Sequence, residues 1–114
     1  TAYIPFTDAN GQADNFRGGK FSKQMLMAST GIGAAIDDGL LNIPFRVLGF
    51  ETTFYDNMGN AVPYVSQSGA FTDQMKAQMR QLGRGKRFYI THVRAVGPDG
   101  IERTLNGAME IIIN

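Results

Sequence analysis

One histidine and no cysteine limit the chemistry available to this 114-residue chain. Without cysteine there is no disulfide, no thiolate nucleophile and no Cys-based metal site. His92 falls in a predicted strand, and the sequence offers neither a nucleophile nor an orienting acid in a catalytic motif with it. We therefore predict that His92 is a partly buried or surface strand residue and that the protein is not an enzyme.

Acidic residues provide two weak candidates for a hard-cation site. Residues 8–14 (Asp-Ala-Asn-Gly-Gln-Ala-Asp) have the alternating oxygen side chains of a calcium loop, but Gly19 stands where that loop needs a bidentate glutamate. The pair Asp37–Asp38 precedes a glycine and is more typical of a solvated turn. We expect no metal ion and no other cofactor.

Two glycine-rich stretches differ from phosphate-binding loops. Residues 31–33 (Gly-Ile-Gly) lack the third glycine and the βαβ context, and residues 83–87 (Gly-Arg-Gly-Lys-Arg) follow a predicted helix instead of opening one. The second stretch gathers Arg84, Lys86 and Arg87. These cations either balance the helix C-terminus or form a docking patch for a partner.

Length and composition indicate one domain over residues 1–114. Hydrophobic residues make up 43% of the chain, and 11 basic against 10 acidic residues leave a net charge of +1. This balance argues against nucleic acid and anionic membrane as partners. Because no apolar run approaches the roughly 20 residues of a membrane helix, we expect any targeting or membrane segment to lie upstream of Thr1, in a longer chain from which this domain is excised.

The strongest strand signal covers residues 43–55, where the apolar phase slips at Val47–Leu48 and predicts a β-bulge. Residues 61–66 return as a hairpin, and Pro63 favours an edge position. Other expected elements are strands at 20–28, 88–96, 101–105 and 109–113, a short strand at 3–6, a one-turn helix or loop at 34–41, and a helix at 71–82 whose methionine stripe faces the core. The sum is a mainly β (α+β) fold, an antiparallel β-sandwich-like domain with one crossover helix near residues 71–82.

The C-terminal third resembles a known family. Residues 85–106 (GKRFYITHVRAVGPDGIERTLN) are similar to the closing block of the GldM/PorM proteins, the motor shaft of type IX secretion and gliding motility. Segments 19–23 (GKFSK), 25–41, 45–54 and 68–82 resemble further family elements in the same order. The resemblance covers residues 18–114, favours a PorM-like member, and leaves residues 1–17 as an unmatched lead-in or linker.

The resemblance implies a non-catalytic periplasmic interaction domain. Family members are anchored in the inner membrane by an N-terminal helix that this sequence lacks, and they cross the periplasm as homodimers. They belong to a proton-driven motor, and their far end meets a ring built from a lipoprotein and its companion at the outer membrane. This chain would be that far end, transmitting force without a reaction of its own and without contact with nucleic acid or membrane.

Three groups of residues are candidates for contacts with partners. They are Arg84, Lys86 and Arg87 for electrostatic steering, Tyr55, Met58 and Tyr64 as apolar anchors near a hairpin tip, and Tyr3, Ile4 and Phe6 for packing against a preceding domain or a second copy. Each group also has an ordinary interpretation as solvated charge, cross-strand packing or core.

The alternative function is a carbohydrate-binding or adhesion module of a surface protein. Such a module needs an exposed aromatic platform, and the absence of tryptophan counts against it. A small hydrolase is a weaker third hypothesis, because its reactive centre would have to be built without cysteine and with one histidine.

Overall fold

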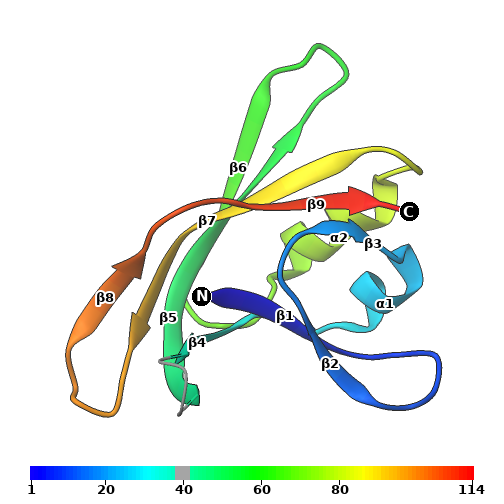
Figure 1. The fold of residues 1–114 in the computed structure, drawn as a ribbon. Helices are drawn as coiled ribbons and strands as arrows, with labels where there is room; N and C mark the ends of the chain where they lie inside the picture. Colours follow the sequence, from blue (N-terminus) through cyan, green and yellow to red (C-terminus); the bar gives the residue numbers. More distant parts are fainter. Residues whose placement is uncertain (38–41) are drawn as a thin grey trace.

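The computed structural model describes residues 1–37 and 42–114. These residues form one mixed sheet of nine strands with two short helices (Figure 1). The strands are β1 (Ala2–Thr7), β2 (Ala13–Phe16), β3 (Gly19–Phe21), β4 (Gly33–Asp37), β5 (Asn42–Tyr55), β6 (Ala61–Ser66), β7 (Arg87–Val96), β8 (Glu102–Leu105) and β9 (Met109–Ile113); the helices are α1 (Lys23–Ala28) and α2 (Asp73–Gln81).

The sheet curls until its two ends approach each other. Its strand order is β2-β1-β4-β5-β7-β9-β3, with β6 added to β5 and β8 added to β7. The end strands β2 and β3 are consecutive in the chain, with only Arg17 and Gly18 between them, and the Phe16 and Phe21 rings stack with centroids 4.3 Å apart. The predicted β-sandwich is therefore wrong, because a single sheet, in which β3 runs parallel to β9, encloses the core.

The core fills the inner face of this curve, where Figure 1 also shows both helices. Phe54 of β5 and Phe88 of β7 stack with centroids 4.7 Å apart. Leu26 from α1 and Met75 and Met79 from α2 have no exposed surface in the same cluster. The methionine stripe is thus core, as predicted, and its burial anchors α2 to the sheet.

The central hairpins follow the predicted pattern. Residues 50–55 of β5 pair with 61–66 of β6, and β6 pairs only with β5, which confirms the edge position predicted from Pro63. The bulge is also confirmed, because the β5–β7 register shifts between Val47 and Gly49 and again between Gly49 and Glu51.

The first third of the chain differs from prediction. Residues 1–17 hold β1 and β2 instead of a loop with one short strand. Of the helical turn or loop expected at 34–41, residues 34–37 belong to β4 instead. The predicted strand 20–28 is confirmed only at residues 20–21, in β3, and is wrong over residues 23–28: Ser22 accepts a hydrogen bond from the Met25 amide and begins α1. A capping serine followed by unbranched Met and Leu favours helix over strand. Residues 38–41 lie outside the described residues, so the Asp37–Asp38 pair is not described.

The Gly97–Gly100 turn joins β7 to β8 and explains the family-like motif physically. Asp99 forms a hydrogen-bonded ion pair with Arg103 at 2.7 Å and accepts a hydrogen bond from the Ile101 amide at 3.0 Å. The hydrogen bonds from Arg103 and from the Ile101 amide lower the pKa of Asp99. Arg103 in turn lies over the Phe45 ring, 5.4 Å from its centroid. The Gly-Pro-Asp-Gly turn and Arg103 therefore hold the β7–β8 hairpin against Phe45 of β5.

Replacing Gly97 with alanine is expected to lower the free energy of unfolding by about 1–3 kcal/mol. A Cβ there would stand 2.9 Å from Phe45 Cε1, against a ring already packed by Arg103. Gly83→Ala is the matched control, because its Cβ would meet nothing within 4 Å. Urea denaturation of both variants checks this, and equal midpoints for the two would contradict it.

Neither helix in the described part of the chain is long and apolar enough to cross a membrane.

Candidate interaction surface

The outer face of the sheet is the surface formed by the outward side chains of β3, β9, β7, β5 and β6. It consists of Lys20, Glu110, Ile112, Arg87, Tyr89, Thr91, Glu51, Thr53, Tyr55, Pro63 and Val65. Their neighbours along each strand, such as Phe88, Ile90 and Ile111, are buried in the core. Since side chains alternate along a strand, this face points away from the core and from the helices.

A polar row crosses the middle of the outer face. Glu110 Oε2 accepts a hydrogen bond from Tyr89 Oη at 2.8 Å and forms an ion pair with Arg87 Nη1 at 3.2 Å. The hydrogen bond to Glu110, with burial, raises the pKa of Tyr89, and contacts with Tyr89 and Glu110 raise the pKa of Arg87. The tyrosine hydroxyl stays protonated and the guanidinium charged, so the row presents a fixed pattern of donors and charge.

Two tyrosines form the apolar part of this face. Tyr55 is 48% exposed, and its ring meets the Tyr89 ring edge to face at 86°, with centroids 6.2 Å apart. Rings at this angle do not form the coplanar platform that a sugar ring would stack on. Tyrosine and arginine together are instead typical of the energetic centre of a protein interface.

The structure separates the three predicted apolar anchors. Tyr55 lies on the outer face, and Met58 is at the β5–β6 hairpin tip, 86% exposed. Tyr64 belongs to the opposite face of β6, where its ring packs edge-on against Phe54, 5.9 Å between centroids. Conversely, the structure brings together two residues from separate predicted patches. Tyr55 and Arg87 lie on the outer face, together with Tyr89 and Glu110.

The basic stretch, residues 83–87, is held in position by backbone hydrogen bonds to the end of β9. The Gly85 amide donates to the Ile113 carbonyl, and the Ile113 amide donates to the Lys86 carbonyl, both at 2.8 Å. Arg84 and Lys86 are exposed. The C-terminal carbonyls of α2 are occupied by Lys23, whose Nζ donates to Arg80 and Leu82 at 2.7 Å.

The predicted packing residues Tyr3, Ile4 and Phe6 all belong to β1. Ile4 has no exposed surface and lies in the core. Tyr3 and Phe6 are half-buried, and Phe6 contacts the Phe21 ring edge-on at 5.0 Å. Only Tyr3 and Phe6 therefore offer surface for a contact with another domain or copy.

His92 stands at the bulge of β7 with a φ of 52°, a left-handed backbone that is rare for a residue with a side chain. Its Nδ1 lies 3.1 Å from Glu51 Oε2 and 2.9 Å from Thr91 Oγ1. Both contacts involve the same ring nitrogen, so the imidazole does not bridge an acid and a nucleophile as a triad requires. The side chain is 73% exposed, which fits the predicted surface histidine.

Within residues 1–37 and 42–114, no three His, Asp or Glu side chains are grouped closely enough to hold a metal ion. The calcium-like stretch is a hairpin turn, in which Asp8 accepts hydrogen bonds from the amides of Asn10 and Gln12 at 2.9 Å. Asp56 forms the same kind of turn with Met58 and Asn60 between β5 and β6.

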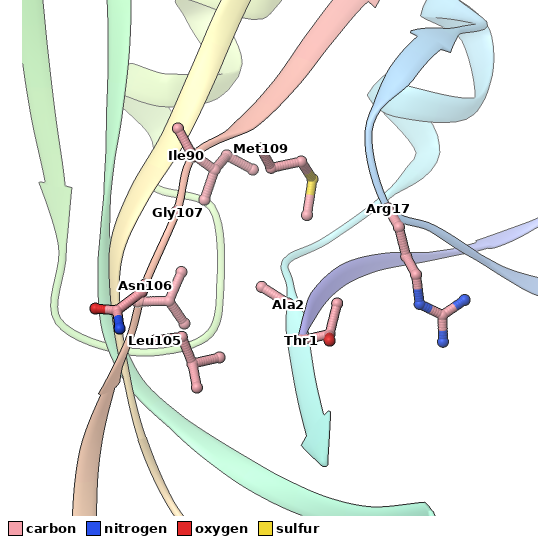
Figure 2. A pocket seen from close by; sticks show the side chains of 10 residues that line it. Thr1, Ala2, Arg17, Ile90, Leu105, Asn106, Gly107 and Met109 are labelled. Atoms are coloured by element: carbon pink, nitrogen blue, oxygen red, sulfur yellow. The ribbon is translucent and has the colours of Figure 1, made fainter. Parts of the chain in front are cut away.

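An opening of about 280 Å³ lies between the start of β1 and the β8–β9 connection (Figure 2). Its lining combines apolar side chains, such as Ile90, Leu105 and Met109, with the polar residues Thr1 and Asn106. Arg17 is the only ionisable side chain there, and Figure 2 shows its guanidinium directed away from the opening. A ligand site needs several converging polar groups, so this opening does not support one.

Asn106, at the rim of this opening, is expected to deamidate faster than Asn10, although glycine follows both. In this reaction the glycine amide nitrogen attacks the asparagine Cγ, ammonia leaves, and water opens the cyclic imide to an aspartyl or isoaspartyl residue. The Gly11 amide is held by the Asp8 carbonyl at 3.0 Å, whereas the Gly107 amide donates to no described residue. Peptide mapping by mass spectrometry after incubation at mildly alkaline pH checks the order, and earlier conversion of Asn10 would contradict it.

Comparison with known families gives one match. The model of a family described as the GldM C-terminal domain matches residues 1–114, including the first 17 residues that motif comparison left unmatched. A search of curated proteins found no match.

Proposed function

Because the chain belongs to the GldM C-terminal domain family, a structural part of the gliding-motility and type IX secretion machinery, we propose that it is a non-catalytic protein-interaction domain. It acts in the periplasm, as part of a longer protein anchored in the inner membrane. It couples the proton-driven motor to the ring of a lipoprotein and its companion at the outer membrane.

The observation that carries this proposal is the outer face. Tyr55 and Tyr89 offer aromatic surface, and the fixed Arg87–Glu110 pair lies next to them. The sheet beneath is rigidly packed, since Phe54 and Phe88 stack directly on its inner side. A coupling domain needs a stiff body with one recognition surface, and this arrangement supplies both.

The homodimer of the parent protein is part of the same proposal. On β1 we assign this contact to the exposed part of Tyr3, because Phe6 lies on the other side of the strand with Ile4 and packs against the core. Light scattering of the isolated domain over a concentration series measures how much of the dimer contact this chain supplies.

The test is a binding assay between the domain and the purified ring components. Replacing both Tyr55 and Tyr89 with alanine is expected to weaken binding at least about tenfold, as loss of interface hot spots does. Ile101→Ala is the control, because Ile101 is 56% exposed and lies outside the outer face. Absence of ring binding by the unmodified domain would refute the proposed function.

A further inference from the structure

Three cations at one edge of the outer face have no acidic partner among the described residues. Lys20, Arg84 and Lys86, here called the basic edge, are exposed, and their side chains form none of the ion pairs or hydrogen bonds within residues 1–37 and 42–114. By contrast, Arg87, Arg94 and Arg103 are each paired with a carboxylate. The basic edge therefore carries uncompensated positive charge.

The fold concentrates this charge around one apolar residue. Lys20 of β3 and Arg87 of β7 are the register partners of Ile112 of β9, so the three side chains form one row across the outer face. The backbone bonds between Ile113 and the 85–86 segment hold the loop bearing Arg84 and Lys86 at the end of the same strand. Ile112 is half-buried, with cations on both sides.

Helix capping does not account for the basic edge. The simplest role of cations after a helix is to neutralise its last carbonyls. Here Lys23 of α1 already occupies two of those carbonyls, at Arg80 and Leu82. Arg84 and Lys86 are thus not needed at those carbonyls, and both are exposed in the loop that is bonded to the end of β9.

We propose that the basic edge and the adjoining outer face bind an acidic protein surface, one with Asp and Glu side chains around an apolar centre. The inference rests on the proposed function and names the chemistry of its partner. The positive charge of the basic edge favours a partner surface with acidic residues. The apolar surface of Ile112, Tyr55 and Tyr89 favours a partner with an apolar patch at its centre, which a purely ionic polymer lacks. The whole chain has a net charge of only +1, so the attraction is local to this edge.

Charge reversal tests the proposal with a matched control. The test variant is Lys20→Glu/Arg84→Glu/Lys86→Glu, and the control is Arg17→Glu/Arg46→Glu/Arg80→Glu, which changes the net charge equally at exposed positions that also form no ion pair within residues 1–37 and 42–114. Binding to ring components is measured across a salt series. The test variant should lose at least about tenfold in affinity and most of its salt dependence, while the control stays within about threefold. Equal loss in both variants, or loss in neither, would overturn the proposal.

A second experiment separates this proposal from the proposed function. A photo-reactive residue replaces Ile112 in the full-length protein in cells, and the cross-linked peptide of the partner is sequenced by mass spectrometry. An adduct on an acidic segment supports the inference even if that partner is not a ring component. An adduct on a non-acidic segment, an adduct on a glycan or lipid, or no adduct refutes the inference, and ring binding in the first assay would still support the proposed function.

Discussion

Replacing Lys76 with methionine is expected to lower the free energy of unfolding by about 3 kcal/mol. Lys76 lies on α2, and its Nζ donates to the carbonyls of Leu26, Met27 and Ser29 at the C-terminal end of α1. Helix ends leave their last carbonyls without intrahelical partners. Methionine keeps the length of the side chain but removes the ammonium donor from all three oxygens, and of these Leu26 alone keeps a described backbone donor, the Ser29 amide at 3.1 Å.

The expected effect is smaller than the sum of three charge-assisted hydrogen bonds. Burial lowers the pKa of Lys76, and the nearby Arg80 lowers it further. Burial and the charge of Arg80 both oppose the charged form in the folded protein, so they offset part of the gain from the carbonyls. The bonds still tie α1, which has only six residues, to the second helix. A helix this short is not stable alone.

The two helices cap each other, because Lys23 of α1 donates to the C-terminal carbonyls of α2. Lys23→Met should therefore also destabilise the domain. Lys86→Met is the matched control, since the Lys86 side chain is exposed and makes none of the described hydrogen bonds. Guanidinium denaturation followed by circular dichroism measures all three variants. If Lys76→Met and Lys86→Met unfold at the same midpoint, the capping role is refuted.

Helix α2 was predictable because its signal is local. Thr72 caps its first turn, and Met75 and Met79 recur at the spacing that buries one face. Helix α1 was not predictable to the same degree, because Met25–Met27 is apolar at every position and its six residues are too short to show a helical period. Likewise, the parallel pairing of β3 with β9 joins residues such as Lys20 and Ile112, which lie far apart in the chain.

The candidate surface was predictable in parts but not as a whole. Side chains alternate between the two faces along β7 and β9, which puts Tyr89 and Glu110 on the outer side. This alternation can be seen in the sequence alone. Which residues face each other across strands depends on register. The bulge sets Thr91 opposite Glu51 and Arg94 opposite Gly49, so counting from one strand to the next fails there. Tyr55 and Arg87 lie beyond the bulge, on strands that β6 and α2 separate in the chain. No connecting turn sets their register, so their shared face became visible only in the structure.

Removing the Phe88 ring is the substitution with the largest expected effect, a loss of about 3–5 kcal/mol on Phe88→Ala. Phe88 has no exposed surface, stacks on Phe54 at 4.7 Å, and lies between the outer face and the helices. Its removal leaves a cavity under the start of β7, where the surrounding core of Met75 and Met79 cannot collapse without moving α2.

The matched control for Phe88→Ala is Tyr55→Ala, which removes an aromatic side chain from the opposite side of the same sheet. Tyr55 is 48% exposed, and its one described aromatic neighbour is Tyr89. We expect Tyr55→Ala to change the free energy of unfolding by no more than about 1 kcal/mol while weakening binding of the ring components.

Phe88→Leu should restore part of the stability lost in Phe88→Ala. Denaturation and binding measured on the same three variants separate the two faces: the inner face sets stability and the outer face sets recognition. If Tyr55→Ala destabilised the domain as strongly as Phe88→Ala, the outer face would be structural, and its assignment as a recognition surface would fail.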